Sequence, residues 1–194
     1  MHDIIPRKDS IILAAIDVLD ECGFQGLTIR EIAQKAGISE GAIFKHYKSK
    51  SDLISAVLDH FSMFDSQIKQ TIELKEMPPK EAIIFAVNSY TNYYESYPAL
   101  TALTEVIDEL TYYPELSDKV KNLYLTRMKF FENLVEEAQA RGEIKSEVNP
   151  ENVADVIMGL FRAICLKWRF LKYDFSLKER TIATLTMVLD SLSI

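Results

Sequence analysis

The 194-residue sequence has few of the residues that build disulfide frameworks, metal centres or phosphate-binding loops. Its two cysteines, Cys22 and Cys165, lie far apart at apolar positions, so we expect two small reduced core residues rather than a disulfide. The three histidines, His2, His46 and His60, lack the spacing of a metal site. Because a Gly-rich phosphate loop and a clustered nucleophile–base motif are also missing, we expect no enzyme, no metal and no cofactor.

Long apolar runs are missing as well. No segment reaches the roughly 18 uninterrupted apolar residues that a membrane-spanning helix needs. Near the N-terminus, Arg7, Lys8 and Asp9 interrupt what would be the apolar part of a signal peptide. We therefore expect a soluble, cytoplasmic protein with no membrane partner.

Hydrophobic residues recur with a helical period almost everywhere, and no convincing strand alternation is present. We predict an all-α fold of about nine helices. The first helix runs from about Asp9 to Cys22 and stops at Gly23. The later helices are predicted to start at Thr28, Ser39, Ser49 or Ser51, Pro79, Pro98, Pro114, Asn149 and Ser176. The helix opened by Pro98 is expected to continue through Leu110, and Pro78-Pro79 is the clearest boundary in the chain.

The charge is unevenly distributed along the sequence. The formal net charge is −7, yet residues 1–50 hold seven Lys or Arg and seven Asp or Glu. Between Thr28 and Lys50, five basic residues face only two acidic ones. Such an asymmetry predicts a polyanionic partner for the first part of the chain alone, although an ordinary solvated helix face is the alternative.

The segment from Thr28 to Tyr47 has the pattern of a helix-turn-helix. Thr28 and Glu31 form a capping box, Gly37 allows the positive φ of a sharp turn, and Ser39 caps the next helix. On that next helix, Ile43 and Tyr47 are spaced to face the core, with Phe44 at the edge. The outer surface is then left to Glu40, Gly41, Ala42, Lys45 and His46. Its small residues would let the helix enter a major groove.

The sequence TIREIAQKAGISEGAIFKHYKSKSDL, from Thr28 to Leu53, resembles the DNA-binding signature of the tetracycline-repressor (TetR) family of bacterial regulators. The matched positions are Thr28, Ile32, Ala33, Ala36, Gly37, Ile38, Ser39, Gly41, Ile43, Phe44, His46, Tyr47, Lys50 and Leu53. The resemblance covers roughly residues 8–55. It implies a three-helix DNA-binding domain in residues 1–50, followed by a helical ligand-binding and dimerisation domain in residues 51–194.

The resemblance also implies roles for single residues. Thr28 and Lys50 match phosphate-contacting positions, while Lys45 and His46 are the best candidates for groove contacts, with Lys45 donating to guanine O6 or N7. The expected DNA-contacting set is Thr28, Ser39, Glu40, Gly41, Ala42, Phe44, Lys45, His46, Tyr47 and Lys50. Simple helix caps and a plain surface histidine are the alternative readings of this set.

One position departs from the family pattern. Phe44 stands where the family usually has a phosphate-contacting tyrosine, and Tyr47 stands where a phenylalanine is more usual. Either the phosphate contact is lost in this chain or another hydroxyl takes its place.

Residues 51–194 are rich in tyrosine and apolar residues at helical spacing. Tyrosine suits a cavity for a mostly apolar small molecule, because its ring is apolar and its tip makes hydrogen bonds. The expected ligand-contacting set is Tyr90, Tyr94, Leu103, Ile107, Tyr124, Met128, Phe131, Phe161 and Trp168. A plain bundle core is the alternative for each of these side chains.

The helix opened by Asn149 is apolar nearly all round, so it needs partners on two sides. Together with the last helix it predicts a four-helix homodimer seam of the kind that the family uses. The expected contacts are Val156, Gly159, Leu160, Ala163, Ile182, Leu185 and Leu189. The alternative is a helix buried inside a monomer.

These features together predict a ligand-responsive transcriptional repressor. A homodimer would bind a partly palindromic double-stranded DNA operator and leave it when a small, mostly apolar effector binds. The alternative is a helical partner-binding or transcription-activating regulator without small-molecule control.

Overall fold

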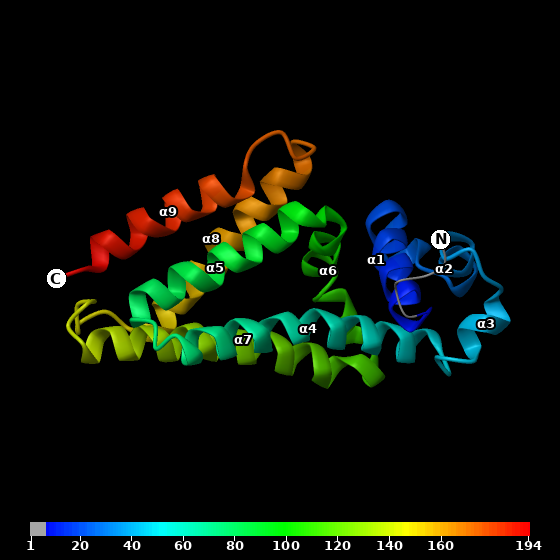
Figure 1. Ribbon diagram of the computed structural model, residues 1–194, viewed down its shortest axis with the longest axis horizontal. Coiled ribbons are helices and arrows are strands. Elements are labelled where there is room, and N and C mark those ends of the chain that lie inside the picture. The colour runs from blue at the N-terminus through cyan, green and yellow to red at the C-terminus, as the bar shows by residue number, and fades with distance from the viewer. Residues whose placement is uncertain (1–6) are drawn as a thin grey trace. The chain divides into compact units, whose positions relative to one another are not determined.

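The structure is a computed structural model that describes residues 7–194, so the first six residues of the predicted domain 1–50 lie outside it. Within the described range the chain forms nine α-helices, two short 3₁₀ helices and no strand, which confirms the all-α prediction (Figure 1). The elements are α1 Arg7–Gly26, α2 Ile29–Lys35, α3 Glu40–Phe44, α4 Lys50–Leu74, α5 Pro79–Ser96, η1 Pro98–Leu100, α6 Thr101–Glu105, η2 Glu109–Tyr112, α7 Pro114–Ala140, α8 Pro150–Phe170 and α9 Leu177–Leu192.

The helices form two compact units whose limits differ from the predicted boundary at residue 50. The first unit contains the described residues up to Phe64 together with Pro98–Lys121, and the second contains Asp65–Tyr97 and Asn122–Ile194. The divisions fall inside α4 and α7. The helix-turn-helix therefore shares a unit with η1, α6 and η2, which come much later in the sequence.

In the first unit, α1 contacts α2, α6 and η1. The predicted stripe of α1, which is Ile12, Ala15, Ile16 and Leu19, is buried. Gly23 interrupts the helical geometry with a φ of 67°, as its predicted role as a stop requires. The prediction of a buried Cys22 is wrong, because the chain turns at Gly23 and Phe24 becomes the next buried residue, leaving Cys22 exposed. Cys165 is buried, and neither of these two cysteines forms a disulfide.

The single helix predicted from Pro98 through Leu110 is also wrong. Three short helices, η1, α6 and η2, take its place. Threonine hydroxyls in this segment donate to carbonyls three residues earlier: Thr101 to Pro98 at 2.6 Å, Thr104 to Thr101 at 2.7 Å and Thr111 to Asp108 at 2.6 Å. Such bonds compete with the backbone N–H groups of a regular helix, so the segment breaks into short turns.

The second unit is built from the end of α4, α5, most of α7, and α8 and α9. α9 packs along α5 and against α8 (Figure 1). As predicted, Asn149 and Ser176 cap α8 and α9, accepting hydrogen bonds from the N–H groups of Asn152 and Glu179 at 3.1 Å each. Its core contains the fully buried side chains of Ile83, Tyr94, Phe131, Ile144 and Leu185.

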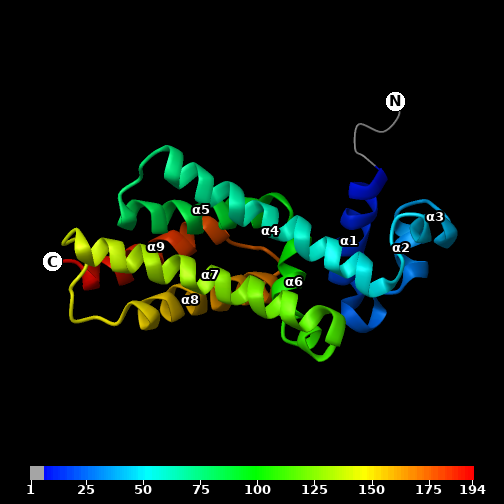
Figure 2. The same ribbon diagram turned by 90° about the horizontal axis from the view of Figure 1, so that it is seen from below.

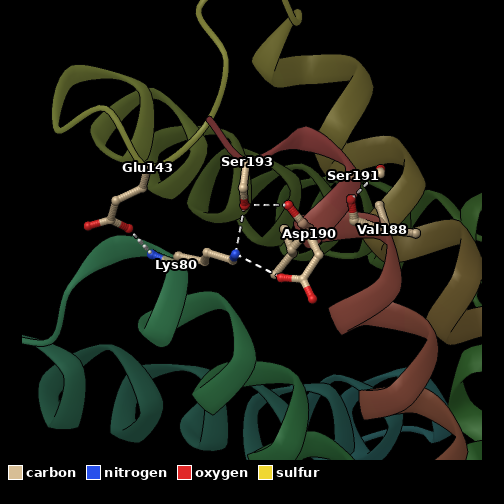
Figure 3. A network of polar contacts seen from close by, with 7 residues as sticks. Lys80, Glu143, Val188, Asp190, Ser191 and Ser193 are labelled. Carbon is tan, nitrogen blue, oxygen red and sulfur yellow. Dashed lines mark hydrogen bonds and ion pairs between the residues drawn. The ribbon is translucent and has the colours of Figure 1, made fainter.

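Figures 1 and 2 place the start of α5, the α7–α8 loop and the end of α9 at the same end of this unit. Lys80 joins all three (Figure 3). Its backbone N–H donates to Glu143 Oε2 at 3.0 Å, and its Nζ donates to Asp190 Oδ1 at 3.0 Å and to Ser193 Oγ at 2.7 Å. The C-terminal turn of α9 is therefore fixed by hydrogen bonds rather than by apolar packing alone.

Candidate nucleic-acid interface

The corner between α2 and α3 is made by Gly37. Its φ is 65°, the left-handed region in which a residue with a Cβ is strained by about 1–2 kcal/mol. The N–H of Ile38 donates to the carbonyl of Ala33 at 3.0 Å, and the N–H of Gly37 donates to that of Gln34 at 3.2 Å. This pair of bonds is a Schellman motif, and it confirms the predicted glycine turn.

Hydroxyl side chains start the helices on both sides of this corner. The Oγ1 of Thr28 accepts from the N–H of Glu31 at 3.2 Å, and the Oγ of Ser39 accepts from that of Ala42 at 3.2 Å. Ser49, rather than Ser51, caps α4, accepting from the N–H of Asp52 at 3.0 Å. A hydroxyl that accepts one hydrogen bond still has its own hydrogen, so Thr28 and Ser39 remain able to donate to a phosphate.

The recognition helix α3 has one buried and one exposed face. Ile43 is fully buried, whereas Glu40, Gly41 and Phe44 are exposed and Ala42 is half-buried; Lys45 and His46, which directly follow the helix, are exposed as well. A Cβ placed on Gly41 would come no closer than 4.0 Å to Ser39 Oγ, so the surface there is open. The predicted outer face is therefore exposed to solvent. Its small residues would let the helix approach closely within a major groove.

Tyr47 does not belong to this outer face, which corrects its place in the expected DNA-contacting set. Its side chain is only 3% exposed, and its hydroxyl donates to the carbonyl of Lys8 at 3.3 Å. The Lys8 ammonium lies 5.7 Å from the centre of the Tyr47 ring. Tyr47 therefore ties α1 to the chain after α3, and it does not replace the hydroxyl that Phe44 lacks.

Lys50, at the start of α4, is half-buried and its Nζ lies 4.8 Å from the centre of the Phe24 ring. Burial lowers the pKa of Lys50, and the nearby charge of Glu109 opposes that shift. Glu109 is held by Gln25, whose Nε2 donates to Oε1 at 2.8 Å. The Lys50 ammonium therefore has the carboxylate of Glu109 nearby and packs against the ring of Phe24.

The expected DNA-contacting set omits two exposed cations of the same corner, Arg30 in α2 and Lys48 before α4. With Lys45 they make three exposed cations around this corner. Their position in the basic segment from Thr28 to Lys50 is the sequence signal that points to them.

In the second unit the structure brings together three of the expected ligand contacts. The rings of Tyr94 and Phe161 are stacked, with centroids 5.6 Å apart and planes 15° apart, and Tyr90 lies 6.2 Å from Phe161. Phe131 and Trp168 are also buried, and the indole N–H of Trp168 donates to the carbonyl of Phe175 at 2.8 Å.

The other expected ligand contacts are placed differently. Met128 is half-buried, and Tyr124 is 42% exposed on the outer side of α7. Leu103 is buried and Ile107 half-buried, and both belong to the first unit. Ligand contact by any member of the set stays a prediction.

A buried ion pair lies beside these tyrosines, and it was not predicted from the sequence. Arg127 Nη2 donates to both carboxylate oxygens of Asp65, at 2.8 and 2.9 Å, and the Tyr90 hydroxyl donates to Asp65 Oδ1 at 2.7 Å. The guanidinium also lies 4.7 Å from the centre of the Tyr90 ring. Burial raises the pKa of Tyr90, which keeps its hydroxyl protonated and able to donate.

Each of the two units contains a hollow that is lined only by its own residues. In the first unit, an apolar cavity of about 10 Å³ is lined by residues that include Phe24, Leu53 and Leu103. It has room for about one water-sized sphere, so it cannot hold an effector. In the second unit, an open cleft of about 830 Å³ lies between α4 and α7, with charged and apolar walls that include Lys69 and Phe130. That volume is in the range of small-molecule sites.

The expected dimer contacts fall into two groups. On α8, Val156, Gly159 and Ala163 are exposed and Leu160 is half-buried; Ile182 on α9 is also half-buried. Leu185 and Leu189 are fully buried within the chain, so their predicted place at a dimer interface is wrong. They face the chain's own bundle because α9 packs against both α5 and α8.

Among residues 7–194, no helix is long and apolar enough to cross a membrane. In the same range, no three His, Cys, Asp or Glu side chains are grouped so that they could hold a metal ion.

Two protein families match the chain. The family described as "Bacterial regulatory proteins, tetR family" matches residues 11–57, which contain the corner. The family described as "Tetracyclin repressor-like, C-terminal domain" matches residues 98–183.

Similar proteins span nearly the whole chain. The HTH-type transcriptional repressor BepR of Brucella suis is 23% identical over 190 residues, which are 95% of this chain and 91% of BepR. The fatty acid metabolism regulator protein of Bacillus subtilis is 24% identical over 165 residues, or 84% of each protein. The crystal structure of FadR from Bacillus subtilis in complex with stearoyl-CoA has the same fold, with a TM-score of 0.81 at 20% identity, covering 95% of this chain and 98% of that one.

Proposed function

The chain belongs to the TetR family of ligand-responsive, DNA-binding transcriptional regulators, and on that premise we propose that it represses as a homodimer bound to a partly palindromic operator. The observation that carries the proposal is the exposed face of α3. Gly37 turns this face outward and Tyr47 anchors it from behind, so that Lys45 and His46 are free to reach base edges.

A dimer meets a physical need of this mode of binding. One short recognition helix makes too few base contacts for useful specificity, whereas two copies can reach successive major grooves about 34–36 Å apart. The exposed apolar positions of α8, Val156, Gly159 and Ala163, support a symmetric seam with a second copy, and Met187 adds an exposed apolar side chain on α9.

The proposed effector is small and mostly apolar. In the second unit the buried rings of Tyr90, Tyr94 and Phe161 would line an apolar site if the effector opens the space between them, and the adjoining Arg127–Asp65 pair would supply a polar anchor. The FadR structure with a similar fold contains stearoyl-CoA, which makes a long-chain acyl compound a sensible first probe. Release from DNA requires that the effector prefer one conformation over another, not merely that it bind tightly.

Binding to duplexes selected from a random pool tests this function. Fluorescence anisotropy with the full chain should show an affinity that falls steeply with salt. A protein with six to ten phosphate contacts loses about 10³–10⁵-fold in affinity between 50 and 200 mM salt. Sedimentation should show two chains on each selected duplex. A chain that stays monomeric, or binds no duplex in a salt-sensitive way, contradicts the proposal.

Helix α4 is the natural link between effector and operator, because one continuous helix carries both Lys50 and Asp65. The variant Ser62→Pro should uncouple them, since proline removes a backbone hydrogen bond and kinks the helix. We expect the folded variant to bind the selected operator but to stay bound at effector concentrations that release the wild type. Ser62→Ala is the matched control and should release normally. Normal release of a folded Ser62→Pro protein would mean that α4 does not carry the signal.

A further inference from the structure

Phe44 is an unusual side chain for the surface that it occupies. It is 51% exposed, and between Thr28 and Lys50 it is the only large apolar side chain with such exposure. Gly41 lies one turn before it on the same side of α3 and leaves the space beside it open. A phenyl ring therefore stands on the face of the helix that the proposed function places against DNA.

Packing within the chain does not explain this ring. Ile43 and Tyr47 supply the buried side of the corner, and Tyr47 also makes the hydrogen bond to α1. Among residues 7–194, no aromatic or cation–π contact involves Phe44. A phenyl ring has no hydrogen-bond donor, so it cannot bind a phosphate oxygen as a tyrosine would.

The major groove offers this ring one apolar partner among the base edges, the C5-methyl group of thymine. We infer that Phe44 contacts a thymine methyl in each half-site and thereby makes the operator require thymine at one symmetric pair of positions. The inference rests on the proposed function, because it assumes that α3 enters the major groove. It identifies Phe44 as a specificity-determining residue, in the place where the family pattern has a phosphate contact.

Replacing thymine with deoxyuridine measures this contact directly, because it removes the methyl group and leaves the base pairing unchanged. Burying one methyl-sized group is worth about a fourfold change in affinity. With two symmetric half-sites, we expect one pair of deoxyuridine substitutions to weaken wild-type binding about 15-fold. The other thymine pairs should give changes of less than about twofold.

The matched variants separate this contact from the other contacts of α3. Phe44→Ala should bind the original operator about as weakly as the wild type binds the deoxyuridine operator, and it should lose nothing more from the substitution. Lys45→Ala, at the next residue of the chain, should keep the full deoxyuridine effect. Because Phe44 is exposed, Phe44→Ala should unfold at the same urea concentration as the wild type, which shows that the variant is folded.

The possible outcomes separate a failure of this inference from a failure of the proposed function. If the wild type binds the selected operator with high affinity but no deoxyuridine pair weakens it, the inference is overturned and the proposed function stands. The same holds if Phe44→Ala keeps the full deoxyuridine effect. If the wild type binds no selected duplex, the proposed function fails and the inference fails with it.

Discussion

The variant Asp65→Ala is expected to lower the free energy of unfolding by about 3–5 kcal/mol, because it leaves the guanidinium of Arg127 buried without its counter-charge. The two side chains are only 14% and 12% exposed, so water cannot replace the lost carboxylate. Asp65 also accepts the hydroxyl of Tyr90, which would lose this acceptor as well. Urea denaturation followed by circular dichroism measures the change.

An ion pair in the same unit whose carboxylate is exposed provides the control. Asp190, which pairs with Lys80, is 63% exposed, and Asp190→Ala should cost less than about 1 kcal/mol. The double variant Asp65→Leu with Arg127→Met should recover most of the lost stability, because an apolar pair avoids the desolvation of two charges. A loss below about 1 kcal/mol in Asp65→Ala would show that the pair is not buried in solution.

We expect this pair to contribute to the response to the effector as well as to stability. It joins α4, which starts at Lys50, to α7, and through Tyr90 it also reaches α5. An effector that lodges against Tyr90 or Arg127 would compete for the same hydrogen bonds. Asp65 is therefore the residue of α4 through which we expect the occupancy of the second unit to affect the helix.

The features that were predictable from the sequence are those fixed by local contacts. Thr28, Ser39, Asn149 and Ser176 each cap a helix through a bond to an N–H three residues later, so a four-residue window is enough to find them. The turn at Gly37 is local in the same way.

The wrong predictions depend on contacts that a local window does not contain. Leu185 and Leu189 have the apolar spacing of a dimer interface, but whether a second copy or the chain's own α5 covers them depends on tertiary packing.

The Asp65–Arg127 pair, which was not predicted, joins residues that are 62 positions apart in sequence. The sequence gives one signal for this pair. Asp65 interrupts the apolar stripe of α4, and Arg127 interrupts the apolar stripe of α7. Opposite charges on two such stripes are a reason to expect that the helices pack together.

The largest effects on DNA binding are expected from Lys45 and Lys50, and they should differ in kind. Lys45, the exposed residue that caps the C-terminus of α3, is the first of these, and Lys45→Ala should cost about 1–3 kcal/mol in each half-site by removing a base contact. For a dimer this is about 2–6 kcal/mol on the selected operator, with little change on random DNA. The base preference at the contacted position should be relaxed, and the salt dependence should change little.

Lys50→Ala should act on all sequences alike, because a phosphate carries no base identity. It should flatten the slope of log affinity against log salt by about one for each lost phosphate contact, or about two for a dimer. To make this contact the ammonium has to leave the face of Phe24, where it lies 4.8 Å from the ring centre. Anisotropy titrations of both variants on selected and random duplexes, over a series of salt concentrations, measure these differences.

Lys35 is the matched control for both variants. It is a lysine of the same corner, at the end of α2, but its ammonium is paired with Glu21 of α1. Lys35→Ala should therefore leave both the affinity and the salt slope nearly unchanged. Equal losses from Lys45→Ala and Lys50→Ala on selected and random DNA would contradict the division of roles between base and phosphate contacts. Such a result would mean that α3 contacts the duplex only through its backbone phosphates.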